Sequence, residues 1–149
     1  MSTSFTDRST TFKNFLDHEH YRFRCSSGFQ IGSDEVGLSS EWCLLCEAPA
    51  SPLTVRMLHD FRRFCRECLE VSFADSGKRD RRIIWRLAEP QTSGLAFDRQ
   101  DCQVEAFQIK ITDQTIEILA RHERGLLHAT HHLEWMMADR GGPSLPRTT

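Results

Sequence analysis

The chain of 149 residues is 39% hydrophobic and 27% charged, an ordinary balance for one globular domain. Its formal net charge of −2 argues against binding nucleic acid by bulk electrostatics, although a local basic patch is compatible with that total. No stretch approaches the ~20 consecutive apolar residues of a membrane span, and the N-terminus lacks the apolar core of a secretion signal. We therefore expect a cytoplasmic protein whose six cysteines are metal ligands or free thiols rather than disulfides.

The first two thirds of the sequence predict a mobile start, one long helix and one strand. Residues 1–14 are rich in Ser and Thr, and we expect them to precede a single domain over residues 15–142. Apolar residues recur at three- and four-residue spacings over about 53–70, which predicts a helix. A charged loop at 72–81 follows, and the β-branched and aromatic run at 83–87 predicts a strand.

The last third has the clearest pattern. Apolar and polar residues alternate over 107–111 and again over 116–118, and the polar residues 112–115 predict a turn between two hairpin strands. We expect a second helix over about 126–139, because the Gly-Gly-Pro at 141–143 is typical of a helix end. These elements predict an α+β domain with a small, mostly antiparallel sheet and two main helices.

Four of the six cysteines form two C-x2-C pairs separated by eighteen residues: Cys43, Cys46, Cys65 and Cys68. Two residues between paired cysteines let both sulfurs reach one tetrahedral ion, with Zn–S distances of ~2.3 Å. We therefore predict a structural zinc site of the zinc-finger type over about 41–70, followed by a sheet–helix part at about 82–142 and a tail at 143–149. Free thiols, a redox pair and an iron–sulfur cluster are the less favoured alternatives.

The centre of the chain is basic. Residues 56–86 contain nine basic and five acidic side chains, whereas both flanking segments are acidic. The simpler interpretation of this segment is a solvent-exposed surface whose basic side chains lie near acidic ones. The alternative is a zinc knuckle that contacts nucleic acid, and its candidate residues are Arg62, Arg63, Arg66, Lys78, Arg79, Arg81 and Arg82.

The predicted C-terminal helix has an apolar face and an opposite face that carries histidines and a tryptophan. His128 and His132 are four residues apart, a spacing able to hold a metal, but no third ligand is evident. We expect an indole on the outer face of a helix to be buried by another part of the chain or by a partner, because it would otherwise expose a large apolar surface. Aromatic anchors are enriched at protein interfaces. The candidate partner-binding residues are Trp135, His128, His131 and His132.

The order of motifs in the C-terminal part matches a known architecture. The strand pair at 105–119 leads into a Gly-Leu-Leu helix at 125 that ends in Gly-Gly-Pro. Residues of about 82–146 thereby resemble the small non-catalytic α/β domain that precedes the catalytic barrel in hexosaminidase-type and glucuronidase-type glycoside hydrolases. The resemblance implies that the helix at 53–70 corresponds to the family's helix between the first strands. The family's catalytic carboxylates lie in a barrel that this chain does not contain, so the chain could be part of a longer enzyme.

No Ser/His/Asp order, phosphate-binding loop or meaningful carboxylate pair is evident, so we expect a protein that is not an enzyme. The leading prediction is a zinc-stabilised binding or adaptor protein that acts through contacts with another protein. The first alternative is a nucleic-acid-binding zinc-knuckle protein. The second is an accessory domain of a carbohydrate-active enzyme. No membrane association is expected, and no sequence feature indicates an oligomeric state.

Overall fold

The computed structural model describes residues 24–26, 28–74, 80–88 and 106–148. The elements in these ranges are, in chain order, β1 (Glu35–Gly37), β2 (Trp42–Cys46), α2 (Pro52–Cys68), β3 (Arg81–Leu87), β4 (Phe107–Ile111), β5 (Thr115–Ala120), α3 (Glu123–Arg140) and β6 (Ser144–Pro146). The predicted α+β class with two main helices is confirmed. The predicted mobile segment at 1–14 lies outside the described residues.

The main sheet is mixed, so the prediction of a mostly antiparallel sheet is wrong. Its four strands have the order β2-β3-β5-β4, and β2–β3 and β3–β5 are parallel pairs. Only the β4–β5 hairpin, which the sequence predicted, is antiparallel within this sheet. The difference arises from α2, which carries the chain back along the sheet so that β3 starts at the same end as β2. A separate two-stranded sheet pairs β1 with β6.

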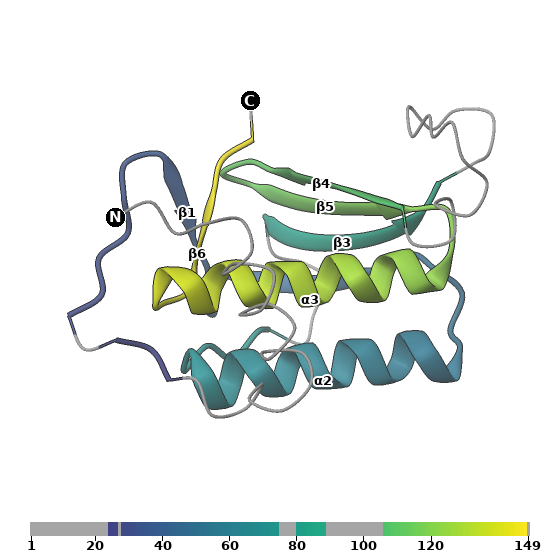
Figure 1. The fold of residues 1–149 in the computed structure, drawn as a ribbon, viewed down its shortest axis with the longest axis horizontal. Coiled ribbons are helices and arrows are strands. Elements are labelled where there is room, and N and C mark those ends of the chain that lie inside the picture. Colours follow the sequence, from purple (N-terminus) through teal and green to yellow (C-terminus); the bar gives the residue numbers. More distant parts are fainter. Residues whose placement is uncertain (1–23, 27, 75–79, 89–105, 149) are drawn as a thin grey trace, which may run out of the picture.

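Both helices lie on one face of the main sheet (Figure 1). The helix-facing side chains of β3 and β5 alternate along the strands, and five of them form the centre of the core: Ile83, Trp85, Ile116, Ile118 and Ala120. Helix α2 reaches this layer through Phe61, whose ring meets the Trp85 ring edge-on at 5.5 Å between centroids. The two helices also pack against each other, which closes a two-layer α/β structure.

Helix α2 begins at a side-chain cap. Ser51 accepts a hydrogen bond from the backbone N–H of Thr54 at 3.2 Å, and Thr54 Oγ1 accepts one from the Ser51 N–H at 2.9 Å. This reciprocal capping box satisfies two helix-end donors, and Pro52 occupies the first turn, where it loses no hydrogen bond. The helix therefore starts one residue before the predicted boundary and ends at Cys68, two residues early.

Helix α3 is held at both ends by glycines. A Cβ at Gly125 would lie 2.5 Å from the Ala106 carbonyl oxygen and 2.8 Å from the Ala120 Cβ, so the first turn packs directly on the sheet. Gly141 ends the helix with φ of 87°, a left-handed conformation that favours glycine. The helix spans three more residues at its start and one more at its end than the pattern predicted.

The end of α3 and strands β1 and β6 are tied together by one carboxylate. Glu35 accepts hydrogen bonds from the Gly32 N–H at 2.9 Å and the Ser144 hydroxyl at 3.0 Å, and it forms an ion pair with Arg140.

Within the described ranges, no helix is long and apolar enough to cross a membrane.

Candidate functional site

The structure separates the first predicted pair of zinc ligands. Cys43 and Cys46 lie on β2, and residues three apart on a strand point to opposite faces of the sheet. Cys43 is level with Arg82 on the face away from the helices, whereas Cys46 is level with the buried Trp85 on the helix side. The sequence pattern had suggested a knuckle loop at this position, where both sulfurs would face one ion.

The second pair is far from Cys46. Cys65 and Cys68 lie in the last turn of α2, which runs antiparallel to β2, and both are fully buried. Cys46 lies near the start of that helix, so ~20 Å of helix axis separates it from Cys65 at about 1.5 Å per residue. In the part of the chain that the structure describes, no group of three or more His, Cys, Asp or Glu side chains could hold a metal ion. The prediction of a zinc finger is therefore wrong.

Cys65 and Cys68 instead line a buried, partly polar contact between the two helices. Burial raises the pKa of the Cys65 thiol well above its ordinary value of 9.0, and the nearby Glu134 and Cys68 raise it further. Burial also raises the pKa of Cys68, although Arg24 opposes this effect and donates from Nη1 to the Cys68 Sγ at 3.6 Å. Both groups are therefore neutral thiols at pH 7, and neutral buried thiols are poor nucleophiles.

Glu134 is a buried residue of α3 that the helical pattern missed. Its exposed fraction is 1%, and it lies on the same side of α3 as the buried Leu126, Thr130 and Met137. The spacing of four residues between positions 126, 130 and 134 was the available signal. The pattern does not reveal it, because Thr and Glu are polar and an apolar face is defined by hydrophobic residues.

The candidate partner-binding stripe on α3 is half-buried rather than fully outward. The His132 ring lies 5.8 Å from the Trp135 ring and 5.9 Å from the Phe107 ring of β4, measured between centroids. Burial lowers the pKa of His132 accordingly. His128 and His131 are also half-buried. An interface at these four residues stays a prediction.

The basic candidates occupy two places. On α2, Arg63 pairs with Glu67 at 3.3 Å, and Arg66 lies 4.0 Å from the same carboxylate, whereas Arg62 is half-buried. At the start of β3, Arg81 pairs with Glu41 at 3.3 Å and Arg82 is exposed. Lys78 and Arg79 lie outside the described residues. Because several of these charges are already paired with carboxylates, they favour the interpretation of a solvated surface, and nucleic-acid contact stays a prediction.

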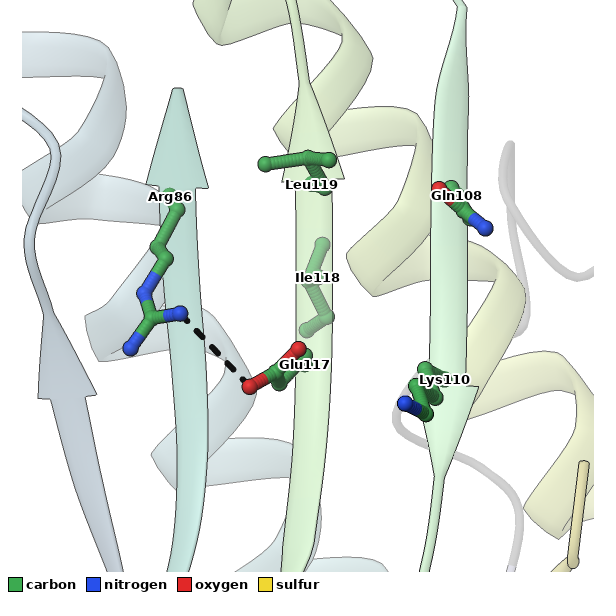
Figure 2. A pocket seen from close by; sticks show the side chains of 6 residues that line it. All are labelled: Arg86, Gln108, Lys110, Glu117, Ile118 and Leu119. Carbon is green, nitrogen blue, oxygen red and sulfur yellow. Dashed lines mark ion pairs between the residues drawn. The ribbon is translucent and has the colours of Figure 1, made fainter. Parts of the chain in front are cut away.

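The face of the sheet away from the helices carries a hollow of about 150 Å³. Figure 2 shows its side chains rising from three adjacent strands: Arg86 from β3, Glu117 and Leu119 from β5, and Gln108 and Lys110 from β4. None of these residues belongs to a site predicted from the sequence. Their signal was the polar half of the strand alternation, which was used only to predict the buried half.

One ion-pair network orders the hollow. Arg86 Nη1 lies 3.5 Å from Glu117 Oε1, and Arg86 Nε donates to Glu47 Oε2 at 2.6 Å. Lys110 is directly opposite Glu117 in the β4–β5 register. The guanidinium is therefore held between two carboxylates, while the Lys110 ammonium and Gln108 amide stay exposed to solvent.

No family model matches the chain, and the comparison with curated proteins found no match. Among solved structures, a GH20 exo-β-N-acetylglucosaminidase from Vibrio harveyi matches 77% of this chain and 16% of its own, with 17% identity and a TM-score of 0.45. A β-N-acetylhexosaminidase from Bacteroides fragilis matches 79% of this chain and 21% of its own, with 18% identity and a TM-score of 0.45. The chain spans about a fifth or less of each enzyme's length. Both belong to the class that the sequence resemblance named, but likeness at this level transfers no activity.

Proposed function

We propose that this chain is a non-catalytic accessory domain of a carbohydrate-active enzyme and that the hollow on the open sheet face contacts a sugar unit. The observation that carries the proposal is the composition of the hollow. A guanidinium, an amide, an ammonium and a carboxylate surround the aliphatic Leu119. Sugar hydroxyls both donate and accept hydrogen bonds, and sugar rings have an apolar C–H face, so this set of groups suits them.

The size and support of the hollow limit its ligand. Typical pockets for small molecules have volumes of about 300–1,000 Å³, and a hollow of about 150 Å³ is smaller. It therefore fits one small group, such as a single sugar ring, with weak affinity. Its side chains stand on three hydrogen-bonded strands, and sites on rigid elements keep their geometry better than sites on loops.

The same geometry favours binding over hydrolysis. Glycosidases generally use two carboxyl groups about 5–9.5 Å apart, one on each side of the scissile bond. Only one carboxylate, Glu117, lines the described hollow, and Arg86 holds it in an ion pair. The described hollow therefore lacks the second carboxyl group that this chemistry uses.

The resemblance seen in the sequence adds to the proposal. The strand pair, the Gly-Leu-Leu helix and the Gly-Gly-Pro end form one packed unit, β4–β5–α3–β6. The close approach of Gly125 to the sheet and the left-handed Gly141 give two of these motif residues a structural reason. Two of the motif residues thus have structural roles within this unit.

Titration of the isotope-labelled chain with N-acetylglucosamine, and with glucose as a comparison, tests the proposal by NMR. We expect saturable shifts of the Gln108, Lys110 and Leu119 amides at millimolar to tens-of-millimolar sugar. Lys110→Ala should weaken binding about 2–10-fold, because it removes one exposed hydrogen-bond donor. Arg56→Ala, which removes a cation from the outer face of α2, is the matched control and should leave binding unchanged. The absence of saturable shifts, or equal weakening by both variants, would overturn the proposal.

A further inference from the structure

The directions of the backbone hydrogen bonds identify the outer edge of β4. The Thr112 N–H donates to the Thr115 carbonyl at 2.8 Å, next to the β4–β5 ladder. Because inward and outward backbone groups alternate along a strand, residues 108 and 110 also bond inward to β5. The residues of β4 that direct both N–H and C=O outward are Phe107, Ile109 and Ile111.

The last of these outward residues already has a partner. The Thr148 N–H donates to the Ile111 carbonyl at 3.0 Å, and the Ile111 N–H donates to Thr148 Oγ1 at 2.8 Å. The outward groups of Phe107 and Ile109 have no such partner among the described residues. Among the described residues, this part of β4 is thus an unpaired strand edge, and such an edge is a template for pairing with another strand.

The opposite edge of the sheet differs. The Ala74 N–H donates to the Trp42 carbonyl at 3.3 Å, and Ala74 forms an isolated parallel bridge with Cys43. The outer side of β2 is therefore partly covered by the chain that follows α2. At Phe107 and Ile109, β4 has no comparable backbone contact from the described residues.

We infer that this edge pairs with the same edge of a second copy of the chain, so that two four-stranded sheets join antiparallel across β4. The inference rests on the backbone groups of β4 and not on the proposed sugar contact, although both involve the side chain of Gln108. Thr148 already bonds to the backbone N–H and C=O of Ile111. A two-fold axis through Ile109 would pair Ile111 of one copy with Phe107 of the other, so this register is not available. The register that pairs both of these outward residues within the described part of β4 is centred on Gln108, with Phe107 of one copy opposite Ile109 of the other.

Side chains in this register are self-complementary. On the helix side, Phe107 and Ile109 are half-buried and pack at the margin of the core, so each copy presents apolar groups to the other. On the open face, Gln108 meets its own copy, and two amides can donate to and accept from each other. Lys110 falls opposite Ala106, so no like charges face each other across the pair.

Sedimentation velocity over a range of concentrations measures the association. We expect a reversible dimer, because only two residues in each copy pair through the backbone. Gln108→Glu places two carboxylates opposite each other and should weaken association about 2–5-fold. Gln114→Glu is the matched control, since it makes the same charge change at an exposed turn residue away from this edge. A monomer at every concentration, or equal effects of the two variants, would overturn the inference.

Disulfide trapping tests the register in a second way. Residues directly opposite each other at a non-hydrogen-bonded position have Cα atoms about 4.5 Å apart, which a disulfide can span. Gln108→Cys should therefore cross-link into a covalent dimer under mild oxidation, several-fold faster than Lys110→Cys or the unmodified chain with its own cysteines. Both substituted positions are exposed, so folding should be preserved in each. Equal rates for the two variants, or no trapping of Gln108→Cys, would contradict the dimer.

Discussion

Thr130 joins helix α3 to the sheet through a single hydroxyl. The Trp85 indole donates to Thr130 Oγ1 at 2.9 Å, and that hydroxyl donates to the Leu126 carbonyl one turn earlier at 2.7 Å. Trp85 and Thr130 are at most 1% exposed. The hydroxyl therefore accepts the hydrogen bond of an indole N–H that would otherwise be buried without a partner. Its own hydrogen is bonded to the Leu126 carbonyl, so no further polar group is needed.

Thr130→Val should remove this acceptor while the size and shape of the side chain stay nearly the same. The Trp85 N–H would then be buried without a hydrogen bond, at a cost of about 1–3 kcal/mol in the free energy of unfolding. Urea unfolding followed by tryptophan fluorescence measures the change. Thr130→Ser keeps the hydroxyl and loses only a methyl group, so it should cost less. A stability of Thr130→Val at or above that of Thr130→Ser would show that the bond contributes little.

The cysteines illustrate what residue spacing alone could and could not predict. A C-x2-C pair fits one metal ion when its two residues lie on a loop or a helix turn, but not when they lie on a strand. The run Trp42–Cys46 gave no polar alternation, because β2 is buried on much of both faces. Parallel strands typically have such continuous apolar runs. The strand was therefore missed, and the metal prediction depended on that omission.

At the scale of elements, sequence periodicity located both helices, the strand at 83–87 and the β4–β5 hairpin within a few residues. These elements have strong local signals: three- and four-residue spacing, alternation and turn residues. The parallel pairing of β3 with β2 and with β5 has no such signal, since its register depends on contacts across the sheet that form only in the folded chain. The open-face hollow was missed for a related reason, because its residues come from three strands that pairing brings together.

The start of helix α2 gives a test at the scale of one element. Ser51→Ala should remove the capping hydrogen bond to Thr54 and lower the free energy of unfolding by about 1 kcal/mol. Chemical denaturation, with far-UV circular dichroism to follow helix content, measures this effect. Ser40→Ala, in an exposed loop before β2, is the control and should change stability by less than about 0.5 kcal/mol. Equal stabilities of the two variants would show that Pro52 and tertiary packing suffice to start the helix.

On the scale of the whole molecule, Glu35 connects segments that are distant in sequence. It bonds to Ser144, 109 residues away, and to Arg140 at the end of α3. Burial raises the pKa of this carboxyl, but hydrogen bonds from Gly32, Arg140 and Ser144, together with the charge of Arg140, outweigh it, and the pKa is lowered from 4.5. A single ionised group thus links the N-terminal part of the domain to its C-terminal strand.

This lowered pKa predicts how acid affects stability. The folded state binds the Glu35 proton more weakly than the unfolded state does. The stabilisation that ionised Glu35 provides is therefore complete above the pKa of the unfolded state, and it is lost as pH falls through the pKa of the folded state. Glu35→Gln should be less stable than the parent by about 1–3 kcal/mol at pH 7. The difference should shrink between about pH 5 and pH 2. Urea unfolding at several pH values measures it.

Glu41→Gln is the control for this experiment, because Glu41 is exposed and forms an ion pair only with Arg81 among the contacts that the structure describes. Its effect should be small at every pH, as expected for a surface ion pair. If the Glu35→Gln difference does not change with pH, the contact between β1, α3 and β6 does not depend on the charge of Glu35.

The pairing of β1 with β6 also determines how the molecule would bear a mechanical load. The strands are antiparallel with Glu35 opposite Pro146, and the Arg147 N–H donates to the Asp34 carbonyl just beyond them. The incoming and outgoing chain therefore meet at the same end of this small sheet. A force that pulls these two segments apart would load its hydrogen bonds one after another rather than all at once. The pair would therefore open one hydrogen bond at a time, beginning at the end where Arg147 bonds to Asp34.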